Sequence, residues 1–282
     1  MGLTISYQLK FETDSEELAR EKITALHQIA LDMPFANVSE LVELKGKEEC
    51  RFNLEDFDDP DRFLKLEAAR GVHRGNTTYH VDAEHLISFL VWPGEGCESA
   101  RLGLAVFPKT IKIPRMSDKE REEKSFLTLH ELLEHKKKMK KPSDREENYE
   151  VLPTDLPSWS WSGFCKTQYA SNPKYGGIEH FLKCHGLIIK LLDHAQELGM
   201  LEEVIDDAEY WEHRDLQKLA HSVGHFNTLV AGILGGLDRM LTNAGVEITN
   251  HESPISEYPN YEYLEAQGEA ELSSKNQEEE SS

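Results

Sequence analysis

Two stretches of the 282-residue chain gather side chains whose types and spacing suit a binding cleft. The first, from Lys166 to Tyr169, supplies an ammonium, an amide and a phenol. The second, from Asp206 to Asp215, adds carboxylates, a guanidinium and an indole within a few helical turns. Acids and cations held close together shift one another's pKa, as is common where a ligand is bound or activated. The candidate cleft consists of Lys166, Gln168, Tyr169, Asp206, Asp207, Tyr210, Trp211, Arg214 and Asp215.

The same residues also have a structural interpretation. If Asp207 or Asp215 pairs with Arg214, the second stretch is an ion-pair cluster that needs no ligand. If the fold instead brings Lys166 close to these acids, the group forms a cleft. A lysine among aromatic neighbours is costly to bury without a carboxylate or water beside it. We therefore expect Lys166 to lie near Asp207 and Asp215.

Two pairs of residues have a spacing that would suit metal ligands on a helix. His180 and Cys184 stand four apart, as do His221 and His225. Side chains four apart share one side of a helix, so two such pairs on adjacent helices could supply four ligands to a soft metal ion. Neither spacing is a zinc signature, and histidine and cysteine are often buried without a metal. The sequence therefore predicts no metal, leaves these four residues as the candidates, and names no cofactor.

The N-terminal half of the chain reads as a sheet with a helix packed against it. Leu3 to Phe11 alternates apolar and polar residues with the period of a half-buried strand. A helix is predicted from about Glu16 to Asp32, because apolar residues recur there every three or four positions and Thr13, Asp14 and Ser15 offer caps. Further strands are predicted near residues 38–44, 86–92 and 101–107. The loop between the last two contains Gly94-x-Gly96, which does not complete a dinucleotide-binding fingerprint.

The C-terminal half predicts one more strand and a pair of long helices. The strand is expected over 164–170, bounded by Gly163 and Asn172-Pro173. The first helix is expected over 178–198, with Gly199 as its stop. The second is expected to begin near Asp206 and to run to about residue 241. The predicted fold class is therefore α+β, with a mixed sheet, helices packed against it and a long C-terminal helix pair.

Two segments differ in composition from the rest. Residues 114–158 combine charged runs with prolines, which indicates an insertion or flap. Residues 245–282 are rich in Glu and Ser, which predicts an acidic disordered tail. We expect one domain over 1–244, with division at the flap as the alternative. Deletion after Asn250 is expected to change stability by less than about 1 kcal/mol. The exceptions within the tail, which could dock on the body or on a partner, are Tyr258, Tyr261, Tyr263 and Leu264.

Composition points to an acidic cytoplasmic protein. The net charge of −21 repels nucleic-acid backbones and anionic membranes, so neither is expected as a partner. No apolar run is long enough to span a bilayer, and no secretory signal is expected. The four cysteines are far apart in the sequence and do not form a disulfide framework, which favours a reducing compartment. They are Cys50, Cys97, Cys165 and Cys184.

Three short runs together resemble a family of uncharacterised bacterial proteins. They are Met1-Gly2-Leu3-Thr4-Ile5, Lys166-Thr167-Gln168-Tyr169-Ala170, and Tyr210-Trp211-Glu212 with Arg214-Asp215. The resemblance covers both ends of the body but neither the flap nor the acidic tail. It implies no activity, so no catalytic residue is carried over from it.

Two functions compete on these observations. The first is a binding or regulatory protein that uses its acidic surface and flap on a basic protein partner. The second is a hydrolase-type enzyme, possible with or without a metal, whose cleft is built from Lys166, Gln168, Asp207 and Arg214. No nucleophile, base and orienting residue form a recognisable set, which disfavours the enzyme.

Overall fold

The computed structural model describes residues 3–114, 149–243, 254–268 and 272. This part of the chain has an α+β fold, as predicted, built on a mostly antiparallel sheet of seven strands. The strands are β1 (Thr4–Phe11), β2 (Asn37–Val38), β3 (Val42–Lys45), β6 (His85–Trp92), β7 (Ala100–Val106), β10 (Trp159–Lys166) and β11 (Leu201–Asp206). Their order across the sheet is β11-β1-β10-β7-β6-β2, and β3 also pairs with β6.

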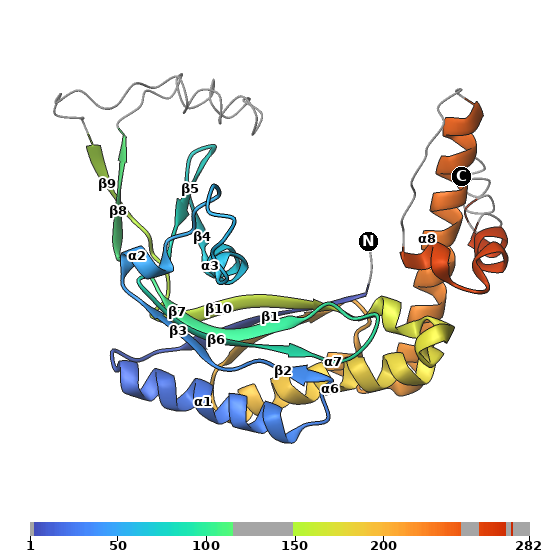
Figure 1. Cartoon of the computed structure of the whole chain (residues 1–282), viewed down its shortest axis with the longest axis horizontal. Coiled ribbons are helices and arrows are strands. Elements are labelled where there is room, and N and C mark those ends of the chain that lie inside the picture. Colours follow the sequence, from blue (N-terminus) through green and yellow to red (C-terminus); the bar gives the residue numbers. More distant parts are fainter. Residues whose placement is uncertain (1–2, 115–148, 244–253, 269–271, 273–282) are drawn as a thin grey trace.

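Two long helices, α1 (Glu16–Asp32) and α6 (Gly177–Glu197), cover one face of this sheet (Figure 1). Of the three candidate caps, Ser15 is the one used, and its Oγ accepts a hydrogen bond from the backbone N–H of Leu18 at 3.3 Å. Apolar residues of α1, of β1 and of the C-terminal half of α6 belong to one buried core, whereas Phe181 and Cys184 of α6 belong to a second, smaller one. Burying a large apolar side chain stabilises the fold by roughly 1.5–3 kcal/mol, so this layer determines which face of the sheet is inside.

The opposite face of the sheet is covered over only part of its width. A hairpin and two short helices lie above it (Figure 1). They are β4 (Arg70–Arg74), β5 (Thr77–Val81), α2 (Lys47–Cys50) and α3 (Arg62–Ala68). α3 contacts β10. A second hairpin, β8 (Thr110–Pro114) with β9 (Tyr149–Pro153), stands at the base of the predicted insertion, whose residues 115–148 lie outside the described part.

The prediction of a single helix after Asp206 is wrong, because the chain forms two helices there. They are α7 (Tyr210–His213) and α8 (Leu216–Asn243). The residues that flank α7, Glu209 and Arg214, have φ angles of 56° and 54°. These left-handed conformations turn the chain before and after a single helical turn, which apolar periodicity does not predict. No helix within the described residues is long and apolar enough to cross a bilayer.

Part of the predicted tail is ordered and packs on the body. A 3-10 turn, η3 (Pro254–Glu257), is followed by a helical segment at 261–268. Ile255, Tyr258 and Leu264 are buried against Ala231 of α8. The expectation of disorder therefore does not hold for 254–268, because the few apolar residues of this acidic segment meet one apolar patch. Tyr258 and Leu264 dock on the body, whereas Tyr263 is 62% exposed.

Candidate functional site

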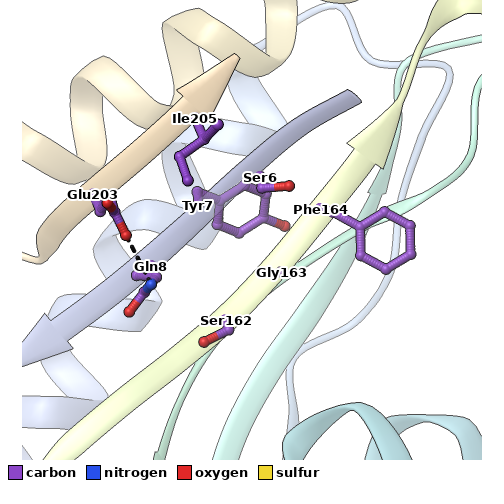
Figure 2. A pocket seen from close by; sticks show the side chains of 8 residues that line it. All are labelled: Ser6, Tyr7, Gln8, Ser162, Gly163, Phe164, Glu203 and Ile205. Carbon is purple, nitrogen blue, oxygen red and sulfur yellow. Dashed lines mark hydrogen bonds between the residues drawn. The ribbon is translucent and has the colours of Figure 1, made fainter. Parts of the chain in front are cut away.

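A depression lies on one side of the sheet across strands β11, β1 and β10, and Figure 2 shows the side chains that line it. The strand register places Ser6 beside Phe164 and Ile205, and it places Gln8 beside Ser162 and Glu203. These six residues, with Tyr7 and Gly163, line a depression of about 280 Å³. We call Ser6, Gln8, Ser162, Phe164, Glu203 and Ile205 the open face.

The open face carries two apolar side chains that no described element covers. Phe164 is 51% exposed and Ile205 is 56% exposed. They flank Ser6 of β1 on either side. A cluster of exposed apolar side chains in a depression is a feature of binding surfaces, whereas single exposed residues are common everywhere. The arrangement of these two residues around one depression therefore identifies the open face as the candidate site.

The alternation predicted for β1 explains why this face is polar at its centre. Ile5, Tyr7 and Leu9 are buried, which leaves Ser6 and Gln8 on the other side of the strand. Gly163 stands beside Tyr7 in the register, and a Cβ atom at Gly163 would lie 2.6 Å from the tyrosine ring. The glycine thus makes room for the ring.

The hydroxyl of this tyrosine is fixed within the sheet. Tyr7 Oη donates a hydrogen bond to the carbonyl oxygen of Arg101 at 2.7 Å. Burial, followed by the nearby Cys165, raises the pKa of Tyr7 well above its ordinary value. Tyr7 is therefore a neutral part of the scaffold.

Acidic residues line the β11 side of the open face. Gln8 Nε2 donates a hydrogen bond to Glu203 Oε2 at 2.8 Å, so an amide rather than a cation holds this carboxylate. Asp207 stands at the end of β11, where its Oδ2 accepts a hydrogen bond from the backbone N–H of Thr4 at 3.1 Å. Both acids are exposed. This edge of the site therefore presents negative charge to an approaching ligand.

Lys166 lies at the same end of β1 as Asp207, on the opposite flank. Thr4 pairs with Lys166 in the β10 register and bonds to Asp207 on its other side. The ammonium of Lys166 lies 5.5 Å from the centre of the Tyr169 ring. No ion pair joins Lys166 to Asp207, although the structure describes both. The fold therefore brings Lys166 to Tyr169 but leaves Asp207 on the other side of Thr4.

Gln168 has a structural position. The strand predicted over 164–170 instead runs from Trp159 to Lys166, and Gln168–Ser171 form a 3-10 turn. There the Gln168 side chain accepts a hydrogen bond from the backbone N–H of Leu3 at 3.1 Å and donates one to Asn227 Oδ1 at 3.0 Å. The Gln168 side chain thus binds the backbone N–H of Leu3 just beyond the last residue pair of the β1–β10 ladder. Gln168 is fully buried and does not reach the open face.

A buried trio resembles a catalytic triad in its residue types. Thr167 Oγ1 lies 2.9 Å from His185 Nδ1, and His185 Nε2 lies 3.2 Å from Asp206 Oδ2. Thr167 and His185 are completely buried, and Asp206 is 5% exposed. A nucleophile must meet its substrate, so a hydroxyl with no solvent access is not suited to that role. We interpret the trio as a structural hydrogen-bond network that joins the residue after β10 to α6 and β11.

Asp206 is the central acceptor of this network. Burial raises the pKa of its carboxyl, but hydrogen bonds from His185 and from backbone N–H groups outweigh burial and hold the pKa below its usual range. The backbone donors are Ala208, Tyr210 and Trp211, at 3.0, 2.9 and 3.0 Å. The carboxylate therefore satisfies the first backbone N–H groups of α7, although the N-cap position of this helix is Glu209.

The other cleft candidates hold α7 and α8 in place. Arg214 donates to both carboxylate oxygens of Asp193 on α6, at 3.0 and 2.6 Å, and its guanidinium lies 4.5 Å from the Trp211 ring centre. Asp215 Oδ1 accepts from the backbone N–H groups of Gln217 and Lys218 and so caps α8. Arg214 pairs with Asp193 rather than with Asp207 or Asp215.

The four metal candidates do not assemble. His180 Nε2 lies 3.5 Å from Cys184 Sγ on α6. His221 and His225 are exposed on α8. Among the described residues, no three or more His, Cys, Asp or Glu side chains are arranged to hold a metal ion.

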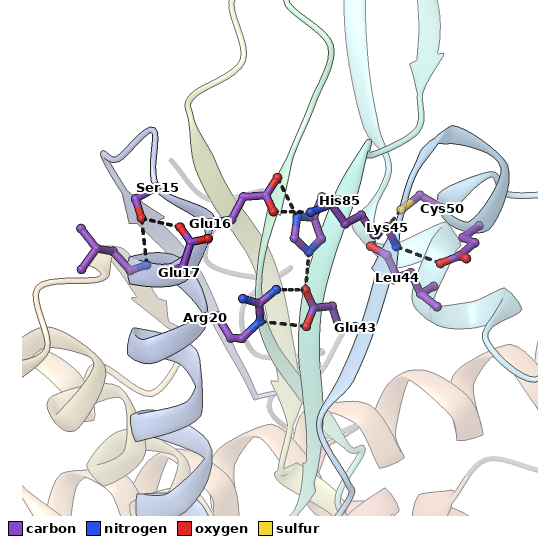
Figure 3. Close-up of polar contacts among 11 residues, drawn as sticks. Ser15, Glu16, Glu17, Arg20, Glu43, Leu44, Lys45, Cys50 and His85 are labelled. Atoms are coloured by element: carbon purple, nitrogen blue, oxygen red, sulfur yellow. Dashed lines mark hydrogen bonds and ion pairs between the residues drawn. The ribbon is translucent and has the colours of Figure 1, made fainter.

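A second polar cluster, which the sequence did not predict, surrounds His85 (Figure 3). His85 is 3% exposed, and its Nε2 lies 2.7 Å from Glu43 Oε1. Arg20 Nε donates to the same carboxylate at 3.0 Å, and Lys45 pairs with Glu16 nearby. The hydrogen bonds from Arg20 lower the pKa of Glu43 to about 2, with burial opposing and His85 assisting. This cluster joins the start of α1 to β3 and β6.

Neither the open face nor the His85 cluster stands out in the sequence, because each combines residues from distant segments. Only the outward positions of Ser6 and Gln8 follow from a local pattern. Comparisons with protein-family models, with curated proteins and with solved structures found no match to this chain.

Proposed function

We propose that this chain is a binding protein whose open face takes an extended, basic segment of a protein partner. The observation that carries the proposal is the pair of exposed apolar side chains, Phe164 and Ile205, on either side of a depression in an uncovered sheet. Buried apolar anchors supply most of the affinity of protein interfaces. The depression is large enough to receive an apolar side chain of a partner.

The position of β11 favours an extended segment. β11 ends the strand order of the described sheet, and Ile205 and Glu203 lie on this strand. A peptide that adds to the edge of a sheet pairs its backbone with the last strand and points alternate side chains to one face. Beside β11, those side chains would reach the open face.

Charge favours a basic partner. Glu203 and Asp207 are exposed along this edge, and the whole chain carries a net charge of −21. Complementary charge accelerates association and excludes like-charged partners, nucleic acids among them. We place this interaction in the cytoplasm, which suits four cysteines that are all free thiols.

A hydrolase built from Lys166, Gln168, Asp207 and Arg214 is the weaker alternative. Gln168 is buried and bonded to Leu3 and Asn227, and Arg214 is engaged by Asp193. Only Lys166 and Asp207 remain near the solvent side of the strands. A general base and a nucleophile must reach the same substrate atoms, which this distribution does not favour.

Selection of short random peptides displayed on phage tests the proposal, with the purified full chain as bait. Selected peptides should combine Lys or Arg with apolar residues at alternate positions. Binding of one such synthetic peptide, followed by fluorescence anisotropy, should weaken about tenfold or more in Phe164→Ala, as expected for an anchor residue. The matched control is Phe57→Ala, because Phe57 is 78% exposed but lies outside the open face.

Methylation of the peptide backbone tests the extended mode separately. A peptide whose alternate N–H groups are methylated on the side that pairs with β11 should lose binding, whereas methylation of the outward N–H groups should be tolerated. Failure to select any peptide, or equal weakening by Phe164→Ala and Phe57→Ala, would overturn the proposal. Equal tolerance of both methylated peptides would exclude edge addition.

A further inference from the structure

The backbone hydrogen bonds of β1 alternate between its two neighbouring strands. On the β11 side, the backbone N–H of Asp207 donates to the carbonyl oxygen of Thr4 at 3.1 Å. On the β10 side, the backbone N–H of Thr167 donates to the carbonyl oxygen of Leu3 at 3.2 Å. In an antiparallel pair, residues that exchange backbone hydrogen bonds alternate with residues that do not. The even-numbered residues of β1 therefore bond to β11, and the odd-numbered residues bond to β10.

The same alternation shows which backbone groups of β11 point away from β1. Ser6 pairs with Ile205, and Gln8 pairs with Glu203. Both pairs are of the hydrogen-bonded kind, so the N–H and C=O groups of Ile205 and Glu203 point to β1. Val204, between them, points its own N–H and C=O groups to the opposite edge. Among the described strands, β11 pairs with β1 alone, so this edge can receive a further strand.

The stretch of β11 that can receive a strand is short. The carbonyl oxygen of Asp206 already accepts a hydrogen bond from the backbone N–H of Glu209 at 2.9 Å. At the other end, the β1–β11 register shifts between Gln8 and Leu9. A partner strand can therefore exchange backbone hydrogen bonds mainly with Val204. Its central residue and the two residues on either side are the ones that the edge positions.

The side chains on either side of Val204 differ in chemistry. Ile205 is 56% exposed and apolar. Glu203 is exposed and acidic, and its Oε2 accepts the hydrogen bond from Gln8 at 2.8 Å (Figure 2). Among the described residues, no donor bonds to the other oxygen, Oε1, which is therefore available to a cation of a partner. One position of β11 thus suits an apolar residue, and the position two residues before it suits a basic one.

A partner residue opposite Ile205 or Glu203 would lie close to it. The backbone groups of both residues are already bonded to β1, so their pairs with a new strand are of the kind without backbone hydrogen bonds. Side chains of such pairs point to the same face and approach one another more closely than those of the hydrogen-bonded kind. The two partner side chains would therefore lie on the open face, each directly beside one side chain of β11.

The direction of the partner strand determines the order of these two residues. The strand pairs on both sides of β1 are antiparallel. In an antiparallel arrangement a single partner residue exchanges both backbone hydrogen bonds with Val204, which suits so short an edge. In a strand of this direction, the residue opposite Ile205 comes before the residue opposite Glu203.

We propose that the open face recognises a three-residue pattern in an antiparallel strand: a large apolar residue, any residue, and then Lys or Arg. Glu203 selects the basic residue, and Ile205 selects the apolar one. The inference rests on the proposed function, because it names the class of segment that the same face binds. Complementary charge and one apolar contact then determine specificity, while the backbone of Val204 contributes affinity for any sequence.

Peptide selection with charge-reversed baits tests the inference. The full-length wild-type chain, Glu203→Lys and Glu40→Lys each serve as bait for the same phage library of random peptides. Glu40 is the matched control, because it is exposed and follows β2, at the other end of the strand order, so its reversal makes the same change in net charge. We expect wild-type and Glu40→Lys to select a large apolar residue two positions before Lys or Arg. Glu203→Lys should select Asp or Glu in place of the basic residue and keep the apolar one.

Binding of synthetic peptides, followed by fluorescence anisotropy, measures the same contacts. A peptide with the selected order should bind wild-type more tightly than a peptide with the apolar and basic residues exchanged. Glu203→Lys should weaken binding of the first peptide about fivefold, the scale for an exposed ion pair replaced by two like charges. Glu203→Gln is the milder second variant, and it should lose the preference for a basic residue without gaining one for an acid. Ile205→Ala should relax the apolar position alone, with circular dichroism confirming that each variant is folded.

The outcomes separate this inference from the proposed function. Selection of Lys or Arg at the same position by Glu203→Lys, or the reverse order of the two residues in wild-type selections, would overturn the inference. The proposed function would survive either result if Phe164→Ala still weakened binding. Selection of no peptide by wild-type, or binding that Phe164→Ala leaves unchanged, would overturn the proposed function and this inference with it.

Discussion

The buried trio lies beside the ends of β10 and β11, two of the strands that form the open face, yet the two regions use polar residues in opposite ways. Thr167, His185 and Asp206 have residue types found in catalysis, but they are sealed in the core and satisfy one another. The open face has ordinary residue types, but Phe164 and Ile205 stand exposed beside a depression. Access to solvent, rather than residue type, therefore separates a structural polar group from a site that can bind a ligand.

The largest effect should come from Asp206→Asn. The carboxylate accepts hydrogen bonds from His185 and from three backbone N–H groups, and an amide cannot accept all of them or balance the imidazole. We expect a loss of about 3 kcal/mol or more in the free energy of unfolding, as for a buried pair with one partner removed. Urea unfolding measures it. Asp207→Asn, next in the chain and exposed, should cost less than about 1 kcal/mol. Equal losses of stability in Asp206→Asn and Asp207→Asn would contradict the distinction between the buried trio and the exposed residues near the open face.

Deletion after Asn250 should have the next largest effect. It removes Ile255, Tyr258 and Leu264 from the patch on α8, and it leaves Ser171 without the Tyr258 hydroxyl that lies 3.0 Å away. We expect a loss of about 2–4 kcal/mol, in contrast to the small change expected from composition. Thermal unfolding of the truncated chain measures it, with Tyr263→Ala as the exposed control. A loss below about 1 kcal/mol would mean that this segment contributes little to the body.

The His85 cluster predicts a pH dependence. The pKa of Glu43 is lowered to about 2 in the folded chain, from an ordinary value of 4.5. The stability that this shift contributes is therefore present above about pH 4.5 and is lost as the pH falls towards 2. Because the carboxylate is about one-third exposed, solvent screening reduces the contribution to roughly 1–2 kcal/mol.

The difference between wild-type protein and Glu43→Gln isolates this contribution from other carboxyl groups. The difference in unfolding free energy should be largest at neutral pH and should shrink as the pH falls from about 4.5 to 2. Urea unfolding at several pH values measures it. A difference that stays constant or grows in acid would contradict the assignment of the shift to Glu43.

Lys166→Met should have the smallest effect on stability. No ion pair joins Lys166 to Asp207, and Met keeps the aliphatic volume beside Tyr169. We expect a change within about 0.5 kcal/mol in the variant, as for a surface substitution. Thermal unfolding of Lys166→Met beside Asp207→Asn checks this expectation. Large losses in both would show that the two residues support the fold and would remove them from the site.

Local patterns predicted most of the elements correctly. Alternation identified β1, and the spacing of apolar residues after the possible caps at 13–15 identified α1. Each of these signals lies within one segment and reflects one buried side. The C-terminal end of β10 was predicted wrongly because the Gln168 side chain accepts a hydrogen bond from the backbone N–H of Leu3, which is far away in the sequence. No local pattern contains that contact.

The site was harder to predict because its residues come from three strands. Lys166 and Asp207 were expected to be neighbours, and the structure places them on the two flanks of Thr4. Phe164 and Ile205 were not singled out, since an apolar residue in a strand is expected to be buried. Their exposure follows from the absence of a described helix above this part of the sheet, which is a property of the whole fold.

The most direct test of the central claim is a map of backbone amide shifts in ¹⁵N-labelled full-length protein as a selected basic peptide is added. We expect the shifts to concentrate on β11, β1 and β10 around Ser6, Phe164 and Ile205, and the amides of the buried trio to move little. Shifts that spare the open face and gather elsewhere, such as on α8, would contradict it.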